Sequence, residues 1–149
     1  MAADGLITIP SSGTVKATLD RLESEVKARG ITVFARIDYA AGAASAGLAM
    51  RPTELLIFGN ATAGTPLMQA IQTIGIDLPL KALAWEDASG RVWLSYNDPG
   101  WLAHRYRLDA SSAAAPSRTE RLVGVSHRSI GGWRVLTAFD RAGPGSPQF

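Results

Sequence analysis

One segment, Arg51 to Ala70 (RPTELLIFGNATAGTPLMQA), constrains the fold more than any other part of the chain. Glu54 to Phe58 is a nearly continuous apolar run, which is typical of a strand buried on both faces. Gly59 to Thr65 follows as a loop of small and polar residues, and Pro66 favours a helix whose N-cap is Thr65. This order predicts a sheet covered by helices, with free backbone N–H groups gathered at one helix start.

Hydrophobic periodicity and turn residues predict the rest of an α+β domain. Apolar residues at helical spacing indicate a helix from the caps around Thr14 to Arg29, and Gly30 ends it. Asp38 caps a short alanine-rich helix, which we expect to pack closely against a neighbour. We therefore expect a two-layer α+β fold, with a mixed sheet of about five strands and helices mainly on one face. The expected strands cover residues 6–9, 31–37, 54–58, 80–86 and 91–96, and a hairpin joins the last two.

The chain divides by composition into an α+β domain over residues 1–109 and an atypical, loosely ordered tail over residues 110–149. The domain carries 10 Lys and Arg against 11 Asp and Glu, so the net charge of +2 comes from five arginines in the tail. Five scattered arginines are weak evidence for a nucleic-acid footprint, which requires a clustered basic patch. Nucleic-acid binding therefore ranks last among the functions considered.

Several classes are disfavoured by what the sequence lacks. It contains no cysteine, which excludes disulfides and thiolate chemistry and fits a cytoplasmic protein. No window approaches the ~18 uncharged apolar residues of a membrane span, so we expect no membrane association. The two histidines, His104 and His127, lack neighbouring ligands, so we expect no metal and no cofactor.

The sequence resembles the domain of unknown function 302 family from roughly Thr14 to Leu108. Five phrases carry the resemblance: VFARID (33–38), RPTELLIFGN (51–60), GTPLMQA (64–70), IDLPLKAL (76–83) and VWLSYNDP (92–99). The resemblance implies a compact α/β domain, often a homodimer, with no assigned activity. The chain departs from the family at Tyr39, where a His is usual, and at Ala61, where a Pro is usual. Its tail does not resemble the family's continuation, and a shifted reading frame is one hypothesis for that difference.

The loop before Pro66 is the first candidate ligand site. Orphan N–H groups and the helix dipole favour an anion there, and Asn60, Gly64 and Thr65 supply side-chain donors and close backbone approach. The competing interpretation is ordinary capping and turning of the chain, and it is the more common one. The loop is neither a Walker A sequence nor a dinucleotide fingerprint.

Two cations near apolar strands, Arg51 and Lys81, would suit an anionic ligand. The alternative is a structural ion pair with Asp77, Glu54 or Glu86. Arg51 and Asn60 bracket one strand of about eight residues, which spans ~25 Å, so they cannot share a small ligand within one protomer.

Tyr39, Tyr96 and Asp98 complete the candidates. Tyr96 could donate a hydrogen bond to a ligand, whereas Asp98 before Pro99 is more simply an N-cap. The leading hypothesis is a small cytoplasmic binding or interaction domain, a homodimer with a pocket for a small anion or metabolite at Asn60–Thr65. The alternative is an enzyme acting on a small anionic substrate, with Arg51 or Lys81 as electrophilic partner and Tyr39 or Asp98 in proton transfer.

Overall fold

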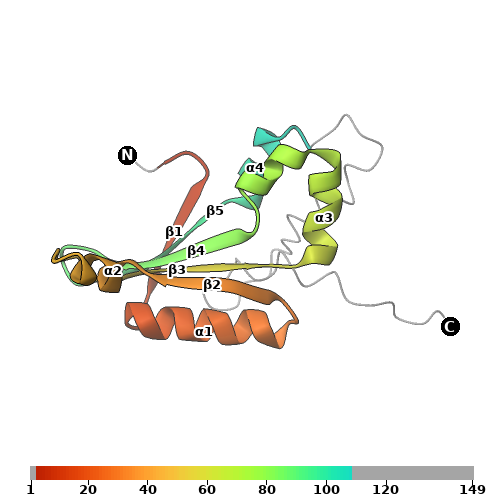
Figure 1. Cartoon of the computed structure of the whole chain (residues 1–149). Coiled ribbons are helices and arrows are strands. Elements are labelled where there is room, and N and C mark those ends of the chain that lie inside the picture. The colour runs from red at the N-terminus through yellow and green to blue at the C-terminus, as the bar shows by residue number, and fades with distance from the viewer. Residues whose placement is uncertain (1–2, 109–149) are drawn as a thin grey trace. The chain divides into compact units, whose positions relative to one another are not determined.

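The computed structural model describes residues 3–108, in which five strands form one sheet in the order β1-β5-β4-β3-β2 (Figure 1). The α+β class and the number of strands are confirmed. The strands are β1 (Leu6–Ser11), β2 (Thr32–Asp38), β3 (Thr53–Gly59), β4 (Leu80–Glu86) and β5 (Val92–Asn97); the helices are α1 (Val15–Ala28), α2 (Tyr39–Ser45), α3 (Ala61–Ala70), the 3₁₀ helix η1 (Gln72–Ile76) and α4 (Pro99–Arg105).

All four strand pairings are antiparallel, so the expectation of a mixed sheet was wrong. A helix between two strands suggests a crossover that makes them parallel. Here α2 and α3 lie at opposite ends of β3 and turn the chain back at those ends (Figure 1). Each therefore joins neighbouring antiparallel strands. The β4–β5 hairpin is closed by the turn before Gly90, which has a φ of 78°.

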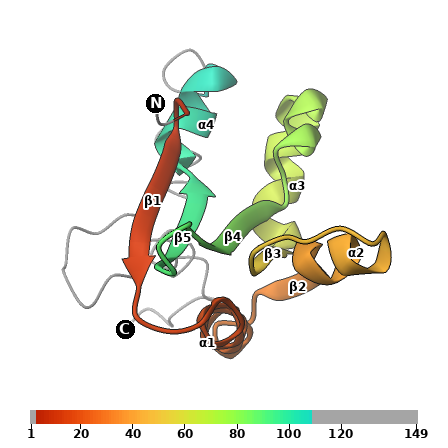
Figure 2. The ribbon, with the colours of Figure 1, turned by 90° about the vertical axis from the view of Figure 1, so that its left-hand side faces the viewer.

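Helix α1 covers one face of the sheet, and α3 rises on the opposite side (Figure 2). Thr14 caps α1 as predicted, because its hydroxyl accepts a hydrogen bond from the Ala17 N–H at 3.1 Å. The predicted apolar stripe is buried and packs across β2, β3, β4 and β5. The core between helix and sheet consists of fully or almost fully buried side chains: Val15, Leu19, Leu22, Val26, Leu56, Phe58, Ala82, Ala84 and Leu94.

The structure corrects two expectations about burial. Strand β3 is buried on one face only: Leu56 and Phe58 lie in the core, whereas Leu55 and Ile57 on the other face are half-buried. Helix α2 has no buried residue, so its alanines do not bring it into close packing. Alanine methyl groups give a helix little apolar surface to bury, and a short helix at the end of a strand has little to pack against.

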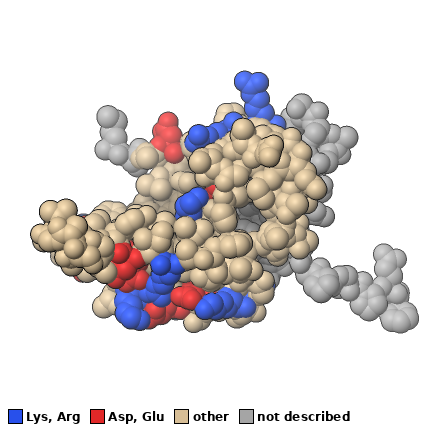
Figure 3. All heavy atoms as spheres, in the orientation of Figure 1, with Lys and Arg blue, Asp and Glu red and all other residues tan. Residues whose placement is uncertain are grey.

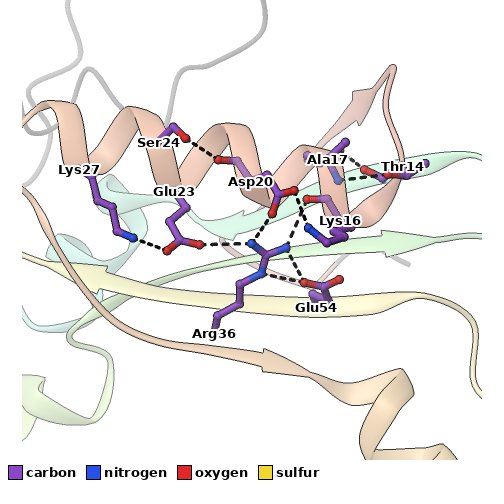
Figure 4. Close-up of polar contacts among 10 residues, drawn as sticks. Thr14, Lys16, Ala17, Asp20, Glu23, Ser24, Lys27, Arg36 and Glu54 are labelled. Atoms are coloured by element: carbon purple, nitrogen blue, oxygen red, sulfur yellow. Dashed lines mark hydrogen bonds and ion pairs between the residues drawn. The ribbon is translucent and has the colours of Figure 1, made fainter.

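Arg36 on β2 binds three carboxylates, two on α1 and one on the neighbouring strand β3 (Figure 4). Its guanidinium donates to Asp20 at 2.6 Å, to Glu54 at 2.7 and 2.8 Å, and to Glu23 at 3.2 Å. Burial opposes the charge of Arg36, but the hydrogen bonds that it donates to Asp20 and Glu54 outweigh burial and raise the pKa of Arg36 above its ordinary value. This ion cluster lies among the charges that gather along α1, whereas the lobe of α2 shows none (Figure 3).

Residues from Pro99 onward form a separate unit, of which the structure describes α4 and the turn after it. Helix α4 begins at Pro99 as predicted. Arg105 lies over the Trp101 ring, 5.5 Å from its centroid, and Arg107 adopts a φ of 52° as the helix ends. The predicted tail, its candidate strands over residues 123–126 and 134–138, and His127 all fall outside the described residues.

Candidate functional site

The predicted loop before Pro66 is already helical. Asn60 is the N-cap of α3, because its side-chain oxygen accepts from the Thr62 N–H at 2.8 Å and its carbonyl accepts from the Gly64 N–H at 2.8 Å. The prediction of Thr65 as N-cap was therefore wrong by five residues. Thr65 is exposed within the helix, and Pro66 lies inside it. Gly64 is likewise a helix residue, so residues 60–65 form the first turns of α3 and its cap rather than a loop.

Arg51 and Tyr39 lie away from α3. Arg51 is exposed two residues before β3, at the end of that strand opposite to Asn60, as strand geometry predicted. Tyr39 begins α2 and is 40% exposed. Its neighbour Asp38 pairs with Glu54 in the sheet, whereas Lys81 pairs with Ile57. At ~3.3 Å per residue and ~4.8 Å per strand, Tyr39 and Lys81 are roughly 15 Å apart, so they do not form one small catalytic site.

A depression lies on the face of the sheet opposite α1, and we call it the open-face pocket. It has a volume of about 330 Å³. Two of the predicted site residues, Lys81 and Tyr96, border it. Strand alternation places the Tyr96 side chain on the α1 face, so Tyr96 borders the pocket through its backbone. The residues that line the pocket are Leu6, Thr8, Leu55, Lys81, Leu83, Trp85, Ser95, Tyr96 and Asn97.

Three side chains from three strands form a hydrogen-bonded row on the pocket floor. The Trp85 indole N–H donates to the Ser95 hydroxyl at 2.9 Å, and that hydroxyl shares a hydrogen bond of 2.8 Å with Thr8. The antiparallel register brings them together, because Ser95 on β5 pairs with Thr8 on β1 and with Leu83 on β4. Ser95 is only 5% exposed, so this row fixes the floor of the pocket in a defined geometry.

Lys81 is the cation of the pocket, and no acidic side chain lines the pocket with it. Its ammonium donates to the Pro79 carbonyl at 3.3 Å. Among residues 3–108 no carboxylate pairs with Lys81 or with Arg51, and Glu54 pairs with Arg36 instead. The structural ion pairs considered for Lys81 and Arg51 are therefore not formed in the described part of the chain.

Trp85, which lines the pocket, stacks on Trp93 of the same hairpin, with ring centroids 6.3 Å apart. Asp87 holds this end together: its carboxylate accepts from the Trp93 indole N–H at 2.9 Å and from the Ser89 hydroxyl at 2.7 Å. These bonds, the one from Trp93 foremost, hold the pKa of Asp87 well below its usual range. The guanidinium of Arg91 lies 5.2 Å from the Trp93 ring centroid. The stacked tryptophans and the hydrogen bonds of Asp87 therefore stabilise the turn end of the β4–β5 hairpin.

Sequence reasoning missed Thr8, Ser95 and the leucines of the pocket. Alternation in β4 and β5 does carry a signal, because Lys81, Leu83 and Trp85 fall on one face of their strand, and Ser95 and Asn97 on one face of theirs. Which faces coincide depends on the strand order and register. Neither is encoded within a single strand, so the cross-strand row could not be assembled from the sequence.

The fold and pocket define a small antiparallel α+β domain with a ligand-sized depression on its uncovered sheet face. The profile of the family described as "Domain of unknown function DUF302" matches residues 7–125, and the chain belongs to this family. A solved relative is the uncharacterized conserved protein DUF302 from Bacillus stearothermophilus. The two share a TM-score of 0.65 at 19% identity, over 78% of this chain and 88% of that one, which supports the common fold.

Similar curated proteins are longer than this chain. It is 54% identical over 111 residues to proteins named fluoride-specific ion channel FluC 1 in Brucella suis and Brucella abortus. The match covers 74% of this chain but 44% and 41% of those proteins, so the chain corresponds to less than half of their length. Within residues 3–108, no helix has the length and apolar character needed to cross a bilayer.

Proposed function

We propose that this chain is a binding domain that takes a small organic anion in the open-face pocket. The observation that carries the proposal is Lys81: a half-buried ammonium in a largely apolar depression, with one carbonyl contact and no carboxylate partner among residues 3–108. An ammonium has three donors and favours a charged acceptor, so a ligand anion would complete its surroundings.

The size and chemistry of the pocket support a ligand larger than a monatomic ion. Its volume of about 330 Å³ falls at the lower end of the ~300–1,000 Å³ typical of small-molecule sites. Leucines and a tryptophan contribute much of the lining and cannot replace the water shell of a small ion such as fluoride. We therefore propose that the DUF302 part of the longer relatives is a binding module distinct from the segments that would conduct fluoride.

The proposal replaces the helix start of α3 as the leading site. A capped helix N-terminus is ordinary architecture, and Asn60 already satisfies the first turn of α3. The homodimer, the cytoplasmic location and the absence of a nucleic-acid partner stay predictions. An enzyme stays the alternative, with Lys81 as the electrophilic group that the pocket would retain.

The test compares three variants with wild type in a thermal-shift screen of organic anions. A ligand that binds the folded state alone raises Tm, and the increase grows with the logarithm of the ligand concentration above its Kd. We expect Lys81→Met to abolish the shifts that wild type shows, and Thr65→Ala on the exposed side of α3 to leave them intact. Shifts that survive Lys81→Met but disappear in Asn60→Ala would refute the open-face pocket and restore the helix start as the site.

A further inference from the structure

We propose that the open-face pocket selects a monocarboxylate with an aliphatic or aromatic body. This inference rests on the binding function proposed above and adds the class of ligand. Its basis is the division of the lining into a polar corner and an apolar half, together with a hydroxyl proton that has no acceptor among the described residues.

The polar side chains of the pocket gather over β5 and its two neighbouring strands, and apart from Leu6 on β1 the apolar side chains lie over β3 and β4. The polar corner lies over β1, β5 and the start of β4, where Thr8, Ser95, Asn97 and Lys81 stand. The register pairs Thr8 with Ser95, and its continuation brings Lys81 level with Asn97. The apolar half lies over β3 and β4, where Leu55 pairs with Leu83. A lining divided in this way matches a molecule with a charged head and an apolar body rather than a uniformly polar ion.

The two hydroxyl groups on the pocket floor carry one more proton than they use in hydrogen bonds to described residues. The Ser95 oxygen accepts the Trp85 N–H, and the hydroxyls of Ser95 and Thr8 share a single hydrogen bond. Two hydroxyl protons serve one bond, and neither residue makes another hydrogen bond within the described part of the chain. One O–H therefore remains for an acceptor. When Ser95, only 5% exposed, donates to Thr8, the spare proton belongs to the exposed Thr8 hydroxyl, which can donate it to water or to a ligand in the pocket.

Lys81 and this hydroxyl row can hold the two oxygens of one carboxylate. Lys81 lies diagonally across from Ser95, because Ser95 pairs with Leu83, two residues further along β4. Diagonal neighbours on one sheet face lie about 7–8 Å apart, and the Lys81 ammonium, which donates to the Pro79 carbonyl, must turn toward Ser95 for a carboxylate to bridge the two. The corner offers an ammonium and a hydroxyl but no carboxylate, so it favours an anionic acceptor and disfavours an amine.

The apolar half sets the second part of the specificity. Leu55 and Leu83 are half-buried and uncovered by α1, and Leu6 at the rim is 40% exposed. A hydrocarbon body placed over Leu55 and Leu83 removes their surface from water at about 25 cal/mol per Å². Acetate, which has a carboxylate but no long hydrocarbon chain, lacks this hydrophobic contribution to binding. An uncharged molecule with the same hydrocarbon chain lacks the ionic contact with the Lys81 ammonium.

The experiment measures dissociation constants of the full chain by isothermal titration calorimetry for hexanoate, acetate, hexan-1-ol, hexylamine, inorganic phosphate and fluoride. We expect hexanoate to bind most tightly. Lys81→Met should weaken it about tenfold or more, and Thr8→Val, which keeps the side-chain shape and the Trp85–Ser95 bond, by about two- to tenfold. Thr65→Ala on α3 serves as the matched control and should leave binding unchanged. A thermal melting curve as cooperative as that of wild type verifies that each variant folds.

The outcomes separate this inference from the proposed function. Equal affinities for hexanoate and acetate would refute the claim that the pocket selects ligands with an apolar body. Phosphate or fluoride binding more tightly than hexanoate, and losing affinity in Lys81→Met, would overturn the carboxylate class while leaving an anion site at Lys81. No Lys81-dependent binding of any anion would overturn both.

Discussion

Replacing Arg36 by Met should reveal how far the ion cluster stabilises the contact between α1 and the sheet edge. Met keeps the aliphatic stem that packs between β2 and α1 but removes the guanidinium. The side chains of Arg36 and Glu54 are 23% and 13% exposed, so their pair lies between the surface and buried limits. Exposed pairs contribute ~0.2–1 kcal/mol, and removing one partner of a buried pair costs ~3–5 kcal/mol. We expect a loss of about 2 kcal/mol at pH 7, or roughly 10 °C in Tm.

The pH dependence of this loss has a definite sign. The pKa of Asp20 is lowered by its bonds from Lys16 and then Arg36, and the pKa of Glu23 by those from Lys27 and then Arg36. Stability from a lowered carboxyl pKa is present above the ordinary value and is lost as pH falls through the folded value. The difference between wild type and Arg36→Met should therefore shrink below the ordinary values of 3.8 and 4.5.

Thermal unfolding followed by circular dichroism at pH 7 and pH 3 provides the assay. Lys27→Met is the matched control, because it removes a cation from the same Glu23 but in an exposed i,i+4 pair, which contributes ~0.3–0.5 kcal/mol. If Arg36→Met lowers Tm no more than Lys27→Met at pH 7, or by the same amount at both pH values, the account of the cluster is wrong.

Three further predictions concern the hairpin and α3, each read from the same melting curves. Asp87→Asn should lower Tm at pH 7, and the difference should narrow between about pH 4 and pH 2, because the lowered pKa of Asp87 makes its contribution disappear in acid; a constant difference would contradict its role as an ionised cap. Gly64→Ala should raise stability by about 0.5–1 kcal/mol, since a Cβ there meets Leu78 and Met68 at 3.9 Å within a helix; a loss would indicate a loop instead. Asn60→Ala should cost ~1 kcal/mol and Thr65→Ala almost nothing, and the reverse order would restore Thr65 as the cap.

Local signals in the sequence predicted the elements well where one signal dominated. Thr14 and Gly30 bound α1, Asp38 caps α2, and the Asp87–Gly90 turn joins β4 and β5, all as expected. At α3 two signals competed, because both Asn60 and Thr65 are good caps and Pro66 favours the later start. The hydrogen bonds that Asn60 accepts start the helix five residues earlier than Thr65 would. The residues near Pro66 carry no sequence signal that favours the earlier start.

The parts that could not be predicted depend on pairing between distant segments. Arg36 was not singled out, although Asp20 and Glu23 are three residues apart on one helix face and together present two carboxylates to the neighbouring strand. The open-face pocket draws on β1, β3, β4 and β5, which meet only through the sheet order. Lys81 was therefore recognisable as a candidate, but its neighbours Thr8, Ser95 and Leu83 required the register.

The most direct measurement of the central claim is a titration of ¹⁵N-labelled chain with hexanoate, followed at the four tryptophan indole N–H resonances by NMR. The Trp85 indole donates to Ser95 on the pocket floor. We predict a saturable shift of the Trp85 indole and of backbone amides in β4 and β5, with the Trp101 indole unmoved and the response lost in Lys81→Met. Shifts confined to the amides of α3, or a Trp85 response that persists unchanged in Lys81→Met, would contradict anion binding at the open-face pocket.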